Sequence, residues 1–147
     1  WTPCIGPILS TVLALAATHD GPLEPLLRAA TQQVAHIAAT TQLGRVVKLV
    51  ISESHTFPEI ARIWHDTVLS KAIGTISEMI ARAQARGEVR DGDPRQHAVT
   101  IVAPLLIGVI YRETFAPIGA TPFDIPSLMK QHLDTVLPGL LIRKDAP

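Results

Sequence analysis

Residues 48–64 read KLVISESHTFPEIARIW and contain the end of one predicted helix, a Phe-Pro corner and the start of a second helix. Apolar side chains fill most positions from 46 to 51, which is typical of a helix buried on nearly every side. Pro58 suits the first turn of the second helix because its φ is already fixed there. Thr56 and Glu59 have the spacing of a capping box, so we predict Thr56 as the N-cap.

The remaining chain also predicts helices. Apolar residues recur every three or four positions, whereas alternation with period two is rare, and the predicted helices span residues 8–17, 22–39, 42–54, 58–86, 94–115 and 124–137. Asp93 and Asp124 are expected N-caps, and Gly87 is an expected helix end. Gly74 predicts a bend or a close backbone approach, and Pro138 predicts an interruption. The sequence therefore predicts an all-α bundle of about six helices.

Composition indicates that the chain needs a partner. A length of 147 residues fits one domain, and hydrophobic residues make up 47% against 18% charged residues. Residues 98–111 are apolar on all faces of their helix, so we expect one side to pack on its own domain and the other on a second chain. The 13 basic and 13 acidic residues leave no basic footprint for DNA binding by this chain itself. Cys4 is the single cysteine, which fits a reducing, cytoplasmic setting.

Residues 1–17, WTPCIGPILSTVLALAA, carry no charge. Their start resembles the first membrane helix of CcdA/DsbD-like thiol-disulfide transporters. A membrane span needs about twenty apolar residues, and Thr18, His19 and Asp20 end this run early. Those transporters also use a second cysteine, which this chain lacks. We therefore expect no membrane association and interpret residues 1–20 as the end of a connecting helix with an atypical start. A membrane-associated thiol-redox protein is the alternative.

The segments KLVISE (48–53) and FPEIAR (57–62) resemble the "RLVIAE" and "FPELAR" sequences of the ligand-binding domains of TetR-family transcriptional regulators. The resemblance continues through ARAQARGEVRDGDP (81–94) and the apolar helix after it, and covers residues 22–141. Lys48 stands where the family usually has arginine, so a bidentate contact is not expected here. The resemblance implies a homodimer whose last two helices form a four-helix bundle with those of the partner.

The same resemblance implies a repressor that binds a small effector between its helices and contacts DNA only through a helix-turn-helix unit. No segment of residues 1–20 is typical of such a unit. We expect the effector-binding and dimerisation domain to span residues 21–142, followed by a tail at 143–147. Helical bundles bind ligands between helices, in mainly apolar pockets with a few polar groups.

Two sets of site residues follow. The predicted ligand-binding residues, at the inner edges of the central helices, are Gln33, His36, Val50, Glu53, Phe57, Trp64, Val68, Tyr111 and Phe115. The predicted dimer-interface residues, on the last two long helices, are Val102, Leu105, Val109, Leu128, His132, Leu133 and Val136. Plain core packing is the alternative for each aromatic residue taken singly.

The sequence offers no catalytic or metal-binding motif. The six histidines are scattered, without HExxH or paired-cysteine spacing. Glu53 and His55 point in different directions on a helix because they are two residues apart. We therefore expect no enzyme activity, no cofactor and no metal.

Overall fold

The computed structural model describes residues 10, 14 and 21–143, and residues 21–143 are dominated by helices. Their α-helices are α2 (Leu23–Thr40), α3 (Leu43–Glu53), α4 (Pro58–Trp64), α5 (Ser70–Ala85), α6 (Pro94–Phe115) and α7 (Ile125–Leu140). A π-helical segment, η1 (His65–Leu69), joins α4 to α5, and a 3₁₀ turn, η2 (Ala116–Ile118), follows α6. Within residues 21–143 the β pairing is one antiparallel bridge, Val89 with Leu141. The all-α prediction is confirmed.

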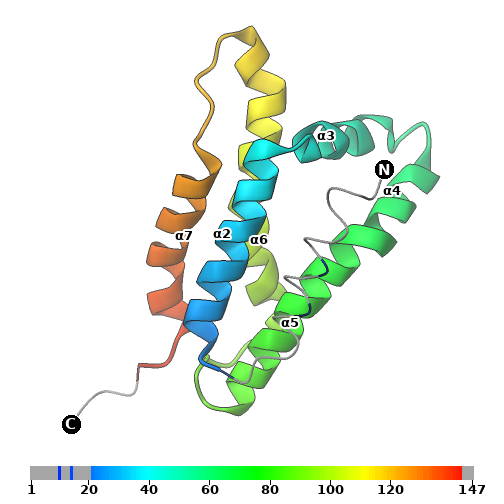
Figure 1. Cartoon of the computed structure of the whole chain (residues 1–147). Helices are drawn as coiled ribbons and strands as arrows, with labels where there is room; N and C mark the ends of the chain where they lie inside the picture. The colour runs from blue at the N-terminus through cyan, green and yellow to red at the C-terminus, as the bar shows by residue number, and fades with distance from the viewer. Residues whose placement is uncertain (1–9, 11–13, 15–20, 144–147) are drawn as a thin grey trace.

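Helices α2, α6 and α7 lie side by side, and α5 packs against α6 (Figure 1). The chain turns by 79° between α2 and α3, so α3 crosses the end of this layer. Helix α4 continues away from the layer, and among the described elements it contacts α3 and η1 alone. Residues 58–69 therefore form an arm that diverges from α2 (Figure 1).

Two groups of buried apolar side chains hold the layer together. The larger joins α2, α5, α6 and α7 and contains Leu23, Leu27, Met79, Ile80, Ala83, Val89, Ala98, Ile101, Leu133, Leu137 and Leu140. The smaller, at the other end of α6, contains Ala35, Ala38, Val109, Ile125 and Met129. Burial of these side chains is the main stabilising contribution, because apolar area leaves water.

Several local predictions are confirmed. The Asp93 carboxylate accepts a hydrogen bond from the backbone N–H of Arg95 at 2.9 Å, and the Asp124 carboxylate accepts one from that of Ser127 at 3.0 Å. The bonds from Ser127 hold the pKa of the Asp124 carboxyl below its usual value. Gly87 ends its helix with φ of 74°, a conformation that glycine adopts without strain.

Other local predictions are wrong. Phe57, not Thr56, is the N-cap of α4, and no side chain caps that helix. The predicted helix 58–86 is confirmed in its extent by α4, η1 and α5, although the π turn at η1 was not predicted, and no described atom lies within 4 Å of a Cβ built on Gly74. Helix α7 continues through Pro138 to Leu140, because a proline in the last turn displaces few hydrogen bonds. The predicted helix at residues 8–17 lies outside the described residues apart from Ser10 and Ala14.

The end of the layer near the C-terminus is fastened by Glu88. Its carboxylate accepts a hydrogen bond from the N–H of Leu23 at 3.1 Å, at the positive end of α2, and pairs with Arg86 at 2.7 Å. Its backbone carbonyl accepts from the N–H of Ile142 at 2.8 Å. A single loop residue thus connects α2, the end of α5 and the chain after α7.

Helices α2 and α7 are further joined by Asp134. Its carboxylate receives Arg28 at 2.6 Å and Lys130 at 3.0 Å. Hydrogen bonds from Lys130 and Arg28 hold the pKa of the Asp134 carboxyl below its usual value. The bond between Arg28 and Asp134 also raises the pKa of Arg28. The pair lies at the surface, where solvent screening keeps such contacts weak.

Candidate functional site

The corner that contains KLVISE packs on the C-terminal half of α6. The ammonium of Lys48 donates one hydrogen bond to the backbone carbonyl of Glu113 at 2.9 Å. Arg112 supplies the guanidinium of this region, with its Nε 3.0 Å from the Glu113 carboxylate and its Nη1 donating to the Ala39 carbonyl at 3.3 Å. These contacts hold the end of α2 and the middle of α3 against α6.

Gly44 allows α3 to approach α6 closely. A Cβ built at this position would lie 2.8 Å from Cγ of Glu113 and 3.0 Å from Nη2 of Arg112. Any side chain here would displace the Arg112–Glu113 pair, so the glycine is required for the contact. Gly44 lies near the start of the predicted helix 42–54, where its spacing gave no sign of a close helix–helix contact.

The predicted ligand-binding residues lie on four elements: α3, the arm, the end of α6, and α2. Val50 is buried and Glu53 is half-buried on α3. Phe57, Trp64 and Val68 lie on the arm or at its start, where Phe57 is exposed and the other two are half-buried. Because α3 contacts both α4 and α6, it is the element that links this set.

Tyr111 and Phe115 belong to an aromatic cluster at the end of α6. The ring centroid of Tyr111 lies 5.2 Å from that of Phe115 and 4.9 Å from that of Phe123. Such tilted contacts are favourable for aromatic rings. Phe123 follows η2 in the loop before α7, so the cluster fastens that loop onto α6. The sequence analysis missed Phe123, because no helical spacing connects it with Tyr111.

Gln33 and His36 are both exposed on α2. The buried face of that helix is formed by Leu27, Thr31, Ala35 and Ala38. The structure therefore does not bring these two polar side chains together with the α3 and α6 residues.

One face of α6 is apolar and uncovered. Val99 is 44% exposed, Leu106 42% and Ile107 60%, and Ala103 lies exposed between them. Burying such side chains is favourable, and a row of them at helical spacing along one helix is typical of an interface. Sequence reasoning selected other α6 residues, because this helix is apolar on every side and its pattern does not indicate which face is outward.

The predicted interface residues divide between this surface and the core. Val109 and Leu133 are 2% and 1% exposed within a single chain, so they are not available to a partner. Val102 and Leu105 are half-buried against the two core clusters. The other predicted residues, all half-buried on α7, are Leu128, His132 and Val136.

Helices α6 and α7 form one continuous surface. A ring nitrogen of His132 lies 3.0 Å from the backbone carbonyl of Thr100, and Cδ2 of Leu128 lies 3.3 Å from a Cβ built on Gly108. We call this surface, with the exposed residues Val99, Ala103, Leu106 and Ile107 and the half-buried Leu128, His132 and Val136, the α6–α7 face.

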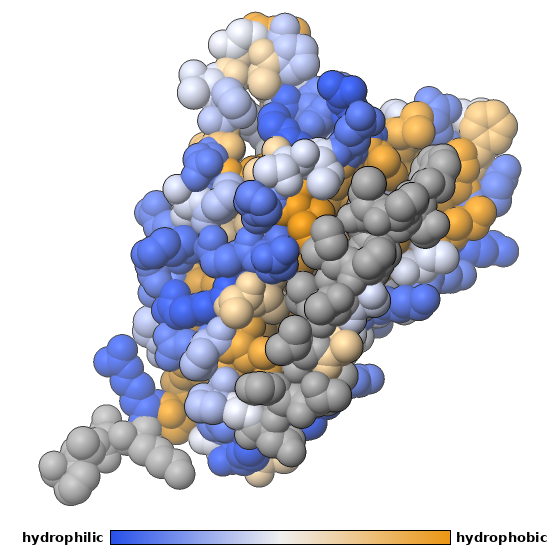
Figure 2. Space-filling model, viewed as in Figure 1, coloured by the Kyte–Doolittle hydropathy of each residue, from blue (hydrophilic) through white to orange (hydrophobic). Residues whose placement is uncertain are grey.

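A second group of exposed apolar side chains lies at the α3–α4 corner. Leu49, Ile51, Phe57 and Ile63 are all about half exposed or more. Figure 2 shows orange side chains at the upper right, where Figure 1 places this corner.

Residues 17–121 match the family model described as Tetracyclin repressor-like, C-terminal domain. The chain belongs to this TetR-like family. The match includes both halves of the corner at residues 48–64, on which the resemblance was recognised. No curated protein and no solved structure matches the chain. Domains of this family are regulatory ligand-binding and dimerisation domains, so the coarse functional prediction is confirmed.

Among the described residues of this TetR-like domain, one long helix meets the length and composition expected of a membrane span. It comprises α6 and η2, Pro94–Ile118, and 22% of its apolar window is buried. The bent pair α2 and α3 meets the same test if taken together. The family match over residues 17–121 places this apolar sequence in a regulatory domain.

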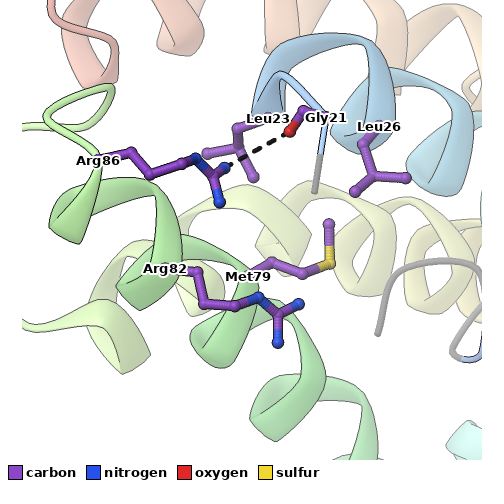
Figure 3. Close-up of a pocket in the computed structure, with 6 residues that line it drawn as sticks. All are labelled: Gly21, Leu23, Leu26, Met79, Arg82 and Arg86. Carbon is purple, nitrogen blue, oxygen red and sulfur yellow. Dashed lines mark hydrogen bonds between the residues drawn. The ribbon is translucent and has the colours of Figure 1, made fainter. Parts of the chain in front are cut away.

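Two depressions on the TetR-like domain lie away from the predicted ligand-binding residues. The first holds about 10 Å³, room for one water molecule at most, and is lined by Gly21, Leu23, Leu26, Met79, Arg82 and Arg86 (Figure 3). Arg86 points across it to the carbonyl of Gly21 at 3.5 Å. This cavity is too small for an effector.

The second is an open groove of about 500 Å³ between the start of α2 and the end of α7. Leu137, Leu141 and Ile142 line it together with Arg28 and Glu88. Arg28 is already paired with Glu24 and Asp134, and Glu88 with Arg86 and the N–H of Leu23. These charged groups therefore have little capacity to orient a ligand.

Proposed function

We propose that this chain is the effector-binding and dimerisation domain, residues 21–142, of a cytoplasmic TetR-like repressor. A small hydrophobic effector binds beside α3 and controls DNA binding by a helix-turn-helix unit that precedes the domain. The observation that carries the proposal is that the α6–α7 face is apolar and exposed in a chain of the TetR-like family. Its exposed apolar residues give a second copy an area to bury, and a two-fold pairing would bring the same face of each copy together.

Sedimentation of the purified chain tests the dimer. We expect the mass of a dimer, twice 15.8 kDa, at micromolar concentration. Obligate homodimer interfaces are more apolar than ordinary protein surfaces, as the α6–α7 face is. A monomer throughout the concentration range would contradict the proposal.

The effector is expected to bind between α3 and the arm. Val50 supplies a buried apolar wall there, Glu53 a carboxylate that can orient a ligand, and Trp64 a large ring on the opposing element. Tyr111 and Phe115 pack in the aromatic cluster at the end of α6, apart from the arm, and are not part of the proposed site. An effector acts only if it binds one arrangement of these elements more tightly than another.

Small aromatic and aliphatic compounds should raise the melting temperature of the chain. A ligand at one hundred times its Kd stabilises the folded state by about 2.7 kcal/mol. Differential scanning fluorimetry with a compound panel measures the shift. In the Trp64→Ala variant the shift should be lost, whereas the exposed His36→Ala control should keep it. Equal melting-temperature shifts in both variants would show that the arm is not part of the binding site. No shift with any compound would refute hydrophobic effector binding.

A further inference from the structure

The junction between α4 and α5 has its own hydrogen-bond pattern. The backbone N–H of Ser70 donates to the carbonyl of His65, five residues earlier, and the N–H of His65 is shared between the carbonyls of Ala61 and Arg62. A π turn of this kind contains one residue more than the α turn that would replace it. The shared bond marks the place where the α-helical pattern ends.

Side chains within η1 support the wider turn. The hydroxyl of Thr67 donates to the carbonyl of Ile63 at 2.6 Å, four residues earlier. Hydrogen bonds of this type bend helices, because they compete with the backbone donor for the same carbonyl. His65 and Asp66 pair at 2.8 Å on the exposed side of the turn, which adds a local contact. The same hydroxyl-to-carbonyl bond occurs in regular parts of α2 and α5, at Thr31 and Ser77, so it accompanies the π turn without by itself causing it.

With the described residues, the arm formed by α4 and η1 makes few buried apolar contacts. None of its residues is buried, and Ile63 is 62% exposed. The next helix differs, because Met79, Ile80 and Ala83 of α5 lie in the core. Segments with few buried apolar contacts open at low free energy, independently of the rest of the fold.

We propose that α4 moves as one unit about η1, which exchanges between the π turn and a regular α turn. In the α turn, the N–H of Ser70 donates to the carbonyl of Asp66 instead of that of His65. This one-residue change rotates α4 about the helix axis relative to α5. Trp64 and Val68 lie on the joint, so their relative alignment changes with it. The proposal of this motion is based on the helix geometry alone. That the motion serves effector control rests on the proposed function.

Amide relaxation dispersion on the full wild-type chain tests the motion without any effector. Helix register shifts occur in microseconds to milliseconds, the range that this method detects. We expect exchange contributions at residues 61–70 and none in α7. Hydrogen exchange should be at least about tenfold faster in α4 than in the buried half of α5. Uniform protection across both helices, or the absence of dispersion at residues 61–70, would overturn the proposal.

Deleting Asp66 removes the extra residue of the π turn and should give a continuous α-helix. Dispersion at the joint should then disappear and exchange in α4 should slow. Deletion of Glu59, an exposed residue in the first turn of α4 and outside residues 61–70, is the control of equal length and should leave the dispersion in place. Dispersion that persists without Asp66 would contradict the two-register motion. The wild-type measurement decides the question even where a deletion prevents folding, and it is independent of dimer formation and of ligand binding.

Discussion

The Ile107→Glu variant should be a monomer at concentrations where the wild-type chain is a dimer. Ile107 is the most exposed large apolar side chain of α6, and two copies meet near it if the α6–α7 faces pair. Each copy would then bury an unpaired carboxylate, which costs several kcal/mol. Since each 1.4 kcal/mol is a factor of ten, the dimer dissociation constant should rise by about a thousandfold or more. Analytical ultracentrifugation over a dilution series measures this change.

Leu49→Glu is the matched control for that experiment. Leu49 is 54% exposed against 60% for Ile107, but it lies on α3, outside the α6–α7 face. The same substitution at a similar exposure should leave the dimer intact. If the dimers of both variants dissociate, added charge in general, and not the position of Ile107, weakens the dimer. If only the Leu49→Glu dimer dissociates, the surface that binds the partner is the α3–α4 corner.

Local chemistry was predictable from the sequence where one side chain decides the structure. Asp93 and Asp124 cap their helices because each carboxylate reaches an N–H two or three residues later. The limits of α6 follow from Pro94 and from the turn at η2. Thr56 failed as a cap because Phe57 occupies the N-cap position before Pro58. A shift of one residue is within the freedom that sequence spacing leaves.

The orientation of helices was less predictable, because it depends on contacts between distant segments. Leu133 and His132 are neighbours on a helix with a broad apolar stripe, and only the position of α2, α5 and α6 decides that Leu133 faces inward. The π turn was also missed, because a hydroxyl such as that of Thr67 is common in regular helices. The residues of the candidate site were hard to predict for the same reason, because the arm diverges from α6 and so separates Trp64 from Tyr111.

Leu133→Ala should destabilise each chain without selectively weakening the dimer. Leu133 is 1% exposed and packs in the larger core cluster with Leu27 and Ile101. Truncating a buried leucine removes apolar contacts and leaves a cavity, which costs about 2–5 kcal/mol of unfolding free energy. For a chain of this size the melting temperature should fall by roughly 2–4 °C per kcal/mol. Chemical denaturation at several protein concentrations measures the loss.

Val99→Ala separates this core effect from an interface effect. Val99 is 44% exposed on the α6–α7 face, so its truncation should raise the dimer dissociation constant and change the monomer's own stability little. Leu133→Ala should show the reverse, because all of its contacts lie within one chain. A loss in the Leu133 variant that vanished at high protein concentration would instead mean that Leu133 contacts the partner, and that α7 rotates its inner face outward on pairing.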